Sequence, residues 1–143
     1  MVVVGFNFNK ITVERKEGSV SGKINISNNV SIKSVEHKDL SLGKTKQEGL
    51  KFTFEFTSRY DPNVGQITLA GEVLYLEEKK KIDEITAKWK KDKKIDQDIM
   101  TPVLNMALTR CNIEALILSQ SMNLPPPIPL PKIQPTQARD YIG

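Results

Sequence analysis

A proline-rich apolar segment near the C-terminus limits what the last part of the chain can form. Between Leu124 and Ile133 five prolines fall within seven consecutive positions, and leucine and isoleucine stand among them. Proline fixes φ at about −65° and lacks a backbone N–H, so the segment can be neither an α-helix nor a central strand. We expect an extended, polyproline-like conformation and call residues 124–133 the proline rail. Its apolar side chains indicate contact with the chain's own sheet or with a partner.

The N-terminal half has the apolar–polar alternation of β-strands. Residues 2–15 predict a long strand, and its alternation slips by one residue between Phe8 and Ile11, which is the mark of a β-bulge. A second strand is expected over 20–35, with a kink or a break at the polar, turn-prone Ser27–Asn29. Residues 36–49 are charged and contain glycine, so we expect a loop there.

The next two strands have clearer limits. Residues 50–57 alternate strictly between apolar and polar side chains, which indicates a sheet with one buried face and therefore antiparallel pairing. The sequence Asp-Pro-Asn-Val-Gly at 61–65 predicts a tight turn. A returning strand follows through Tyr75, and Gly71 suggests a bend in its middle.

From Glu77 the apolar spacing becomes helical. Ile82, Ile85 and Trp89 predict one face of a first helix. A second helix is expected to begin near Thr101 and Pro102, or earlier if Asp96 or Asp98 caps it. One stripe of this helix suits packing on the sheet, and a second apolar side formed by Ile113, Leu116 and Ile117 predicts an interface with another subunit.

Strands followed by helices predict an α+β fold, a four-stranded antiparallel meander with a bulged first strand and helices on one face. With 143 residues, we expect one domain over 1–133 and a polar tail over 134–143. No apolar run approaches the length of a membrane span, and no signal peptide is recognisable. We therefore expect a cytoplasmic protein without membrane insertion.

The sequence offers little for catalysis or for cofactor binding. It has no glycine-rich phosphate loop, no histidine-containing metal motif and no nucleophile elbow, so we expect a non-enzyme without a cofactor or a bound metal. The single histidine, His37, lies in a polar stretch and is interpreted as an exposed bystander. The single cysteine, Cys111, lies on an apolar helix and is interpreted as an inert buried thiol.

Five lysines around Trp89, within Lys88–Lys94, form the best candidate for nucleic-acid contact. The alternative is that Trp89 continues the Ile82–Ile85 stripe into the core while the lysines favourably end the helix at its negative pole. We favour the second interpretation, because the net charge of +4 permits nucleic-acid binding without implying it.

The proline rail has three interpretations. The spacing of Pro126 and Pro129 fits a ligand for an SH3- or WW-type groove, although an apolar helix rather than a flexible arginine-bearing chain precedes it. The rail can instead cover the sheet edge as a strap, or form one wall of a groove for extended apolar peptide. The last two interpretations are compatible with each other.

These features together resemble the SecB export-chaperone family. The bulged first strand, the antiparallel sheet and the proline loop after a helix carry the resemblance. Gly-Phe-Asn-Phe at Gly5–Phe8 and Leu-Pro-Pro-Pro-Ile-Pro-Leu-Pro at Leu124–Pro131 are most similar to short archaeal SecB-like proteins. The family's C-terminal helix would be reduced to 134–143 here, and the acidic surface that docks the SecA motor is not evident.

The resemblance implies a homotetramer, built as a dimer of dimers, that holds unfolded polypeptides without ATP and that can serve protein export. Family clients lie in grooves lined by aromatic and aliphatic side chains. The positions that the resemblance makes candidate client contacts are Leu124, Pro126, Ile128 and Leu130 on the rail, Phe6 and Phe8 on the first strand, and Phe52, Phe54 and Phe56 on the third. The alternatives are a non-enzymatic subunit with one specific protein partner and a weak nucleic-acid binder.

Overall fold

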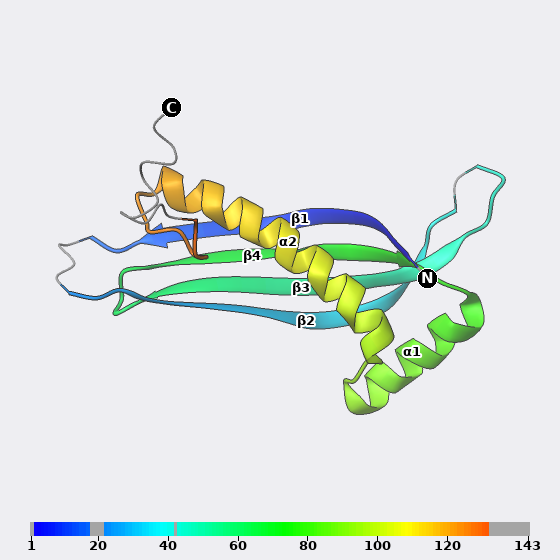
Figure 1. The fold of residues 1–143 in the computed structure, drawn as a ribbon. Coiled ribbons are helices and arrows are strands. Elements are labelled where there is room, and N and C mark those ends of the chain that lie inside the picture. The colour runs from blue at the N-terminus through cyan, green and yellow to red at the C-terminus, as the bar shows by residue number, and fades with distance from the viewer. Residues whose placement is uncertain (1, 18–21, 42, 132–143) are drawn as a thin grey trace, which may run out of the picture.

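Four antiparallel strands form one layer of the protein and two helices pack on that layer (Figure 1). This architecture is seen in a computed structural model, which describes residues 2–17, 22–41 and 43–131. The predicted tail at 134–143 and the last residues of the rail, 132 and 133, lie outside the described residues. In chain order the elements are β1 (Val2–Arg15), β2 (Asn25–Asp39), β3 (Glu48–Asp61), β4 (Gly65–Leu76), α1 (Lys79–Asp92) and α2 (Gln97–Ser121).

The sheet is antiparallel as predicted, but its connectivity is not a meander. Its spatial order is β1-β4-β3-β2, so the first two strands lie at opposite edges. Val2 pairs with Leu76 at one end of the β1–β4 ladder, and Arg15 pairs with Gly65 at the other. The meander was expected because strands that are consecutive in sequence usually pair. That expectation holds for β2, β3 and β4, while β1 pairs along its whole length with β4.

The bulge predicted in the first strand is confirmed. The β1–β4 register shifts between Phe8 and Lys10, and it shifts a second time between Val3 and Gly5. These shifts keep Phe6 opposite Val73 and Phe8 opposite Gly71, which places both rings on the buried face of the sheet.

The break predicted in the second strand at Ser27–Asn29 is wrong. β2 passes through these residues without interruption, and its irregularity lies between Ile32 and Ser34. Asn28 pairs directly with Ser58 of β3 and accepts a 2.6 Å hydrogen bond from the Ser58 hydroxyl, so its polar side chain has a partner within the sheet. The loop predicted over 36–49 is also shorter than expected, because β2 extends to Asp39 and β3 begins at Glu48.

The core lies between the sheet and the helices. The strict alternation of β3 is confirmed: Leu50, Phe52, Phe54 and Phe56 are fully buried, and the residues between them are only partly covered. The row continues through Ser58 and Tyr60, which are also buried. Ile82 and Ile85 of α1 belong to the same core, and half-buried Trp89 packs against it.

The second helix starts at Gln97 after Asp96, which is the earlier of the predicted starts, and Pro102 therefore lies inside the helix. Its buried residues recur at every fourth position, as Val103, Ala107, Cys111, Ala115 and Ser119. Four of these five side chains are small, and they form a narrow buried stripe along α2, which crosses the strands of the sheet (Figure 1).

Candidate functional site: the proline rail and its groove

The rail begins where the second helix ends. Asn123 adopts a left-handed conformation with φ 54°, and the N–H of Leu124 donates to the carbonyl of Ser119 at 2.8 Å. This bond satisfies a carbonyl at the end of α2 and turns the chain back along the helix. The side chain of Leu124 is buried, 6% exposed, close to Gly65 at the β3–β4 turn.

Two side chains of the sheet hold the backbone of the rail. The phenol O–H of Tyr60 donates to the carbonyl of Pro125 at 2.7 Å, and the Asn28 amide donates to the carbonyl of Pro127 at 2.7 Å. Prolines have no N–H to donate, so a proline segment can be fixed through its backbone only if its surroundings supply the donors. Here β2 and β3 supply them.

The protonation state of Tyr60 suits this role. Burial raises the pKa of the Tyr60 phenol above its usual value. The phenol is therefore a donor across the neutral pH range. Ser58 completes the polar contacts by holding the Asn28 side-chain oxygen, which orients the amide nitrogen toward Pro127.

One side of the rail faces an open groove. The groove has a volume of about 550 Å³ and lies between the C-terminal end of α2 and the rail. Pro126 and Leu130 are exposed along it, and Leu130 is 48% exposed. Ile128 is half-buried, while Pro127 is the buried proline of the rail. The residues that line the groove are Leu116, Ile117, Ser119, Gln120, Asn123, Leu124, Pro126 and Leu130.

The rail is therefore both a strap and a wall. Leu124 and Pro127 cover the end of the core, as a strap does, while Pro126 and Leu130 border the groove. The buried side chains fit the strap interpretation, and the exposed ones lie on a groove as the wall interpretation requires. That this groove accepts extended peptide stays a prediction.

The second apolar side predicted for α2 is present. Ile113 and Ile117 are 53% and 54% exposed, and Leu116 is partly covered. Ile117 and Leu116 also line the groove, so this helix face and the outer side of the rail form one continuous apolar surface. Patches of this kind mark interaction sites on proteins.

The aromatic candidates separate into two groups. Phe52, Phe54 and Phe56 are fully buried and belong to the core, so the structure corrects their assignment as surface contacts. Phe6 and Phe8 are half-buried, and Phe6 stacks on Phe54 with ring centroids 5.3 Å apart. The Arg110 guanidinium lies 4.9 Å from the Phe6 ring centroid and covers that ring from the side of α2.

Asn28, Ser58 and Tyr60 were not among the predicted site residues. The apolar alternation of β3 was followed only to Thr57, although Tyr60 continues the same buried face. Asn28 was interpreted as a turn residue from its type. An asparagine or a tyrosine in the sequence does not by itself reveal its hydrogen-bond partner, which for Asn28 and Tyr60 is the distant proline rail.

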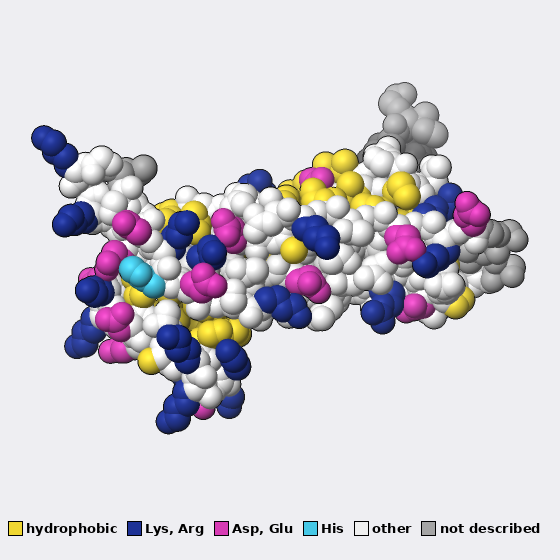
Figure 2. Space-filling model, turned by 180° about the vertical axis from the view of Figure 1, so that it is seen from behind, with side chains coloured by type: hydrophobic (Ala, Val, Ile, Leu, Met, Phe, Trp, Pro, Cys, Tyr) yellow, Lys and Arg dark blue, Asp and Glu magenta, His cyan; other side chains and the backbone are white. Residues whose placement is uncertain are grey.

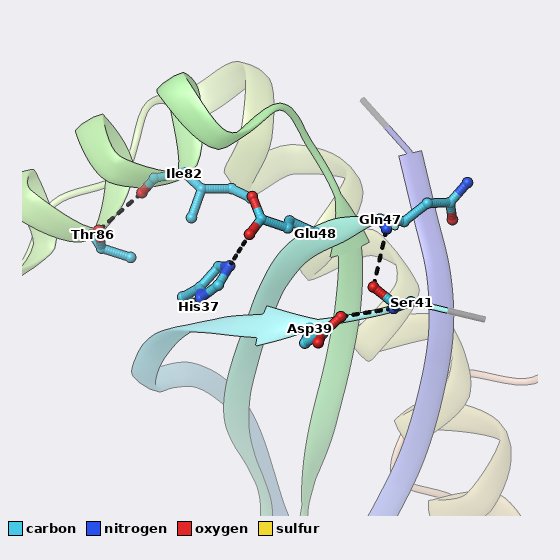
Figure 3. Close-up of polar contacts among 7 residues, drawn as sticks. All are labelled: His37, Asp39, Ser41, Gln47, Glu48, Ile82 and Thr86. Atoms are coloured by element: carbon cyan, nitrogen blue, oxygen red, sulfur yellow. Dashed lines mark hydrogen bonds and ion pairs between the residues drawn. The ribbon is translucent and has the colours of Figure 1, made fainter. Parts of the chain in front are cut away.

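A polar cluster surrounds His37 at the end of the sheet where β2 and β3 are joined (Figure 3). His37 is exposed, as predicted, and its Nε2 lies 3.4 Å from a carboxylate oxygen of Glu48. Hydrogen bonding by Ser41 lowers the pKa of Asp39. A hollow of about 750 Å³ opens here, but among the described residues no three carboxylate, histidine or cysteine groups gather in a way that could hold a metal ion.

Lysines concentrate on and just after α1. Residues 79–94 contain eight lysines and three acidic residues, a net charge of +5 against +4 for the whole chain. Figure 2 shows these basic side chains around the projecting first helix, whereas the sheet surface carries both signs of charge. The ammonium group of Lys93 lies 5.2 Å from the centroid of the Trp89 ring.

Comparisons with protein-family models, with curated proteins and with solved structures find no match to this chain. None of the helices in the described part of the chain is long and apolar enough to cross a membrane.

Proposed function

We propose that this protein is a SecB-like, ATP-independent holding chaperone that binds extended apolar segments of unfolded polypeptides in the groove beside the proline rail. The observation that carries the proposal is the continuous apolar surface of Ile113, Ile117 and Leu130, each about half exposed, next to an open groove. Surfaces that offer apolar contact with few directed polar groups suit clients of varied sequence.

The chemistry of the rail supports the same function. A polyproline segment has already lost much of its backbone freedom, so a client that binds to it orders little additional chain. From Pro125 to Pro131 the rail has N–H groups only at Ile128 and Leu130, too few for the main-chain ladder that strand addition uses. A client would therefore be recognised chiefly through its apolar side chains.

We further propose that the protein works as a cytoplasmic homo-oligomer, a tetramer built as a dimer of dimers. The exposed Ile113 and Ile117 support this assembly, because half-exposed isoleucines on a helix are suited to burial against another subunit. A link to protein export is part of the same proposal and rests on the family resemblance.

The experiment is aggregation suppression without nucleotide. A chemically denatured model protein is diluted into buffer with and without the chaperone, and light scattering is followed. We expect suppression by the wild-type protein and weaker suppression by a variant carrying Ile117→Ser and Leu130→Ser. Val4→Ser is the matched control, because Val4 is 52% exposed but lies on β1 outside the groove.

Two results would contradict the proposal. Wild-type protein that leaves aggregation unchanged has no holding activity toward the tested client. Capture of one stoichiometric protein, combined with indifference to unfolded clients, would instead favour a dedicated subunit with a single partner.

The concentration of charge on and after α1 favours nucleic-acid binding as a second candidate function. Lysines neutralise phosphates and release counterions, which makes such binding steeply salt-dependent. The half-buried Trp89 with Lys93 beside its ring is a poor platform for base stacking, so phosphate contacts would dominate. The test is a mobility shift of single-stranded RNA or DNA at low salt. A shift that disappears when Lys90, Lys91, Lys93 and Lys94 become glutamine supports it, and no shift at low salt excludes it.

A further inference from the structure

We propose that Asn28, Ser58 and Tyr60 form a latch that positions the proline rail, and that opening this latch uncovers a second part of the client-binding surface. The inference deepens the proposed function and rests on it for its client-binding part. The latch itself is defined by hydrogen bonds and burial, so it can be tested separately.

The latch holds the rail at two neighbouring points from two different strands. Tyr60 on β3 binds the carbonyl of Pro125, and Asn28 on β2 binds the carbonyl of Pro127. The two anchored carbonyls are separated by one residue, and the backbone bends at Pro127 and Ile128. Two anchors from different strands hold the rail at and just before this bend.

Few other backbone bonds are available to the rail. From Pro125 to Pro131 only Ile128 and Leu130 carry an N–H. Beyond Leu124, whose N–H closes the end of α2, the bonds from Tyr60 and Asn28 are the two found on the rail backbone within the described residues. The closed position therefore depends on two side-chain donors rather than on a ladder of main-chain bonds.

The surface beneath the rail contains buried residues of the sheet end, Tyr60 and Val64. Leu124 and Pro127 are the buried side chains of the rail itself, and Leu124 lies close to Gly65 at the same end of the sheet. These residues adjoin the groove, because Leu124 also lines it. An open rail would extend the groove toward the sheet and enlarge its apolar contact area.

The latch groups suit repeated opening. The side-chain amide, the hydroxyl and the phenol can all bind water when they leave their protein partners. Opening the latch therefore costs only the net free energy of each hydrogen bond, which is much smaller than its strength without water. A client whose apolar side chains cover Tyr60 and Val64 would replace the burial that Leu124 and Pro127 of the closed rail now provide. Rail and client thus compete for one surface.

Thiol labelling tests the latch directly. A Leu124→Cys substitution places a reporter at the buried start of the rail, and its reaction with a neutral aromatic disulfide reports exposure. Cys111 is a silent internal standard, because burial raises the pKa of its thiol to about 12. Cys111 will react only when the whole domain unfolds.

We expect Tyr60→Phe and Asn28→Ala to raise the labelling rate at position 124 by about fivefold for each hydrogen bond removed. Ser121→Ala is the matched control, because the Ser121 hydroxyl bonds to the carbonyl of Ile117 rather than to the rail. Unchanged labelling at position 124, or labelling that rises in step with Cys111, would overturn the latch. If the Leu124→Cys variant does not fold, Ile128→Cys provides the reporter on the half-buried part of the rail.

A second measurement separates the latch from the proposed function. Tyr60→Phe with Asn28→Ala, in the otherwise wild-type chain, is compared with wild type for affinity to a denatured client. Faster labelling with tighter client binding supports both proposals. Faster labelling in a protein that binds no client retains the latch and removes the holding function. Client binding by wild type, with neither labelling nor affinity changed in the variant, removes the latch alone.

Discussion

Phe8 of β1 and Phe54 of β3 face each other across the intervening strand, with ring centroids 6.4 Å apart and ring planes at 71°. Both residues are register partners of Gly71 in β4. A glycine between two aromatic residues leaves room for their rings to meet above it. The inner face of the sheet is therefore held together by an aromatic contact between strands that share no hydrogen bonds.

This geometry makes Gly71 intolerant of a side chain. A Cβ there would lie 2.2 Å from the Asn7 carbonyl oxygen and 3.0 Å from the Phe54 ring, and backbone cannot move aside as a flexible side chain can. We expect Gly71→Ala to lower the free energy of unfolding by about 1–3 kcal/mol, measured by urea denaturation. Gly5→Ala is the control, because the atoms nearest to its Cβ would belong to the Leu74 side chain, at 3.1 Å and beyond, and not to the backbone. Equal losses for both variants would contradict this explanation.

Much of the fold is predictable from local patterns. The alternation of β3, the bulge after Phe8 and the two helices follow from the spacing of apolar residues, and the structure contains all of them. The pairing of β1 with β4 does not follow, because alternation shows which face of a strand is buried but not which strand lies beside it. The continuity of β2 was missed for a related reason, since Asn28 is satisfied by Ser58, a partner distant in sequence.

The candidate site was predictable only in part. The rail and the apolar second side of α2 were apparent from composition and helical spacing. The sequence did not show which rail side chains are exposed to solvent. Pro127 is buried and Leu130 is exposed because Tyr60 and Asn28 hold the rail backbone in one position. A family resemblance likewise cannot separate core phenylalanines from surface ones, as the buried Phe52, Phe54 and Phe56 illustrate.

Substitutions in the core should lower the stability of the fold, whereas substitutions in the groove should weaken client binding. Phe54→Ala removes a fully buried ring and should lower the free energy of unfolding by about 3–5 kcal/mol. Leu130→Ser changes a half-exposed side chain and should alter that free energy by no more than about 0.5 kcal/mol while weakening client binding. Urea denaturation measures the free energy of unfolding of both variants, and titration with a denatured client measures their binding. Unaltered client affinity in a folded Leu130→Ser protein would remove Leu130 from the binding surface.

The exposed face of α2 should control assembly. The double variant Ile113→Glu and Ile117→Glu places two negative charges on a surface that an adjoining subunit would bury. Burial of a charge without a partner is costly, so the variant should not assemble. We expect the oligomer to fall to a smaller mass by light scattering after size-exclusion chromatography, with the helical signal in circular dichroism retained. Asn105→Glu introduces a charge elsewhere on the exposed side of α2 and should leave the mass unchanged. A wild-type protein that is already monomeric would exclude this interface.

The buried thiol of Cys111 should make the protein less stable at alkaline pH. Burial raises the pKa of its thiol from 9.0 to about 12, so above pH 9 the unfolded chain releases this proton while the folded protein retains it. The folded state then binds more protons than the unfolded state, and the free energy of unfolding falls as pH rises between these two pKa values. Cys111→Ala, which matches Ala107 and Ala115 on the same buried stripe, removes the effect. Between pH 8 and pH 10, urea denaturation should show the wild-type protein losing about 1.4 kcal/mol more than the variant. Parallel pH profiles for the two proteins would mean that the thiol ionises as readily in the folded state as in the unfolded chain.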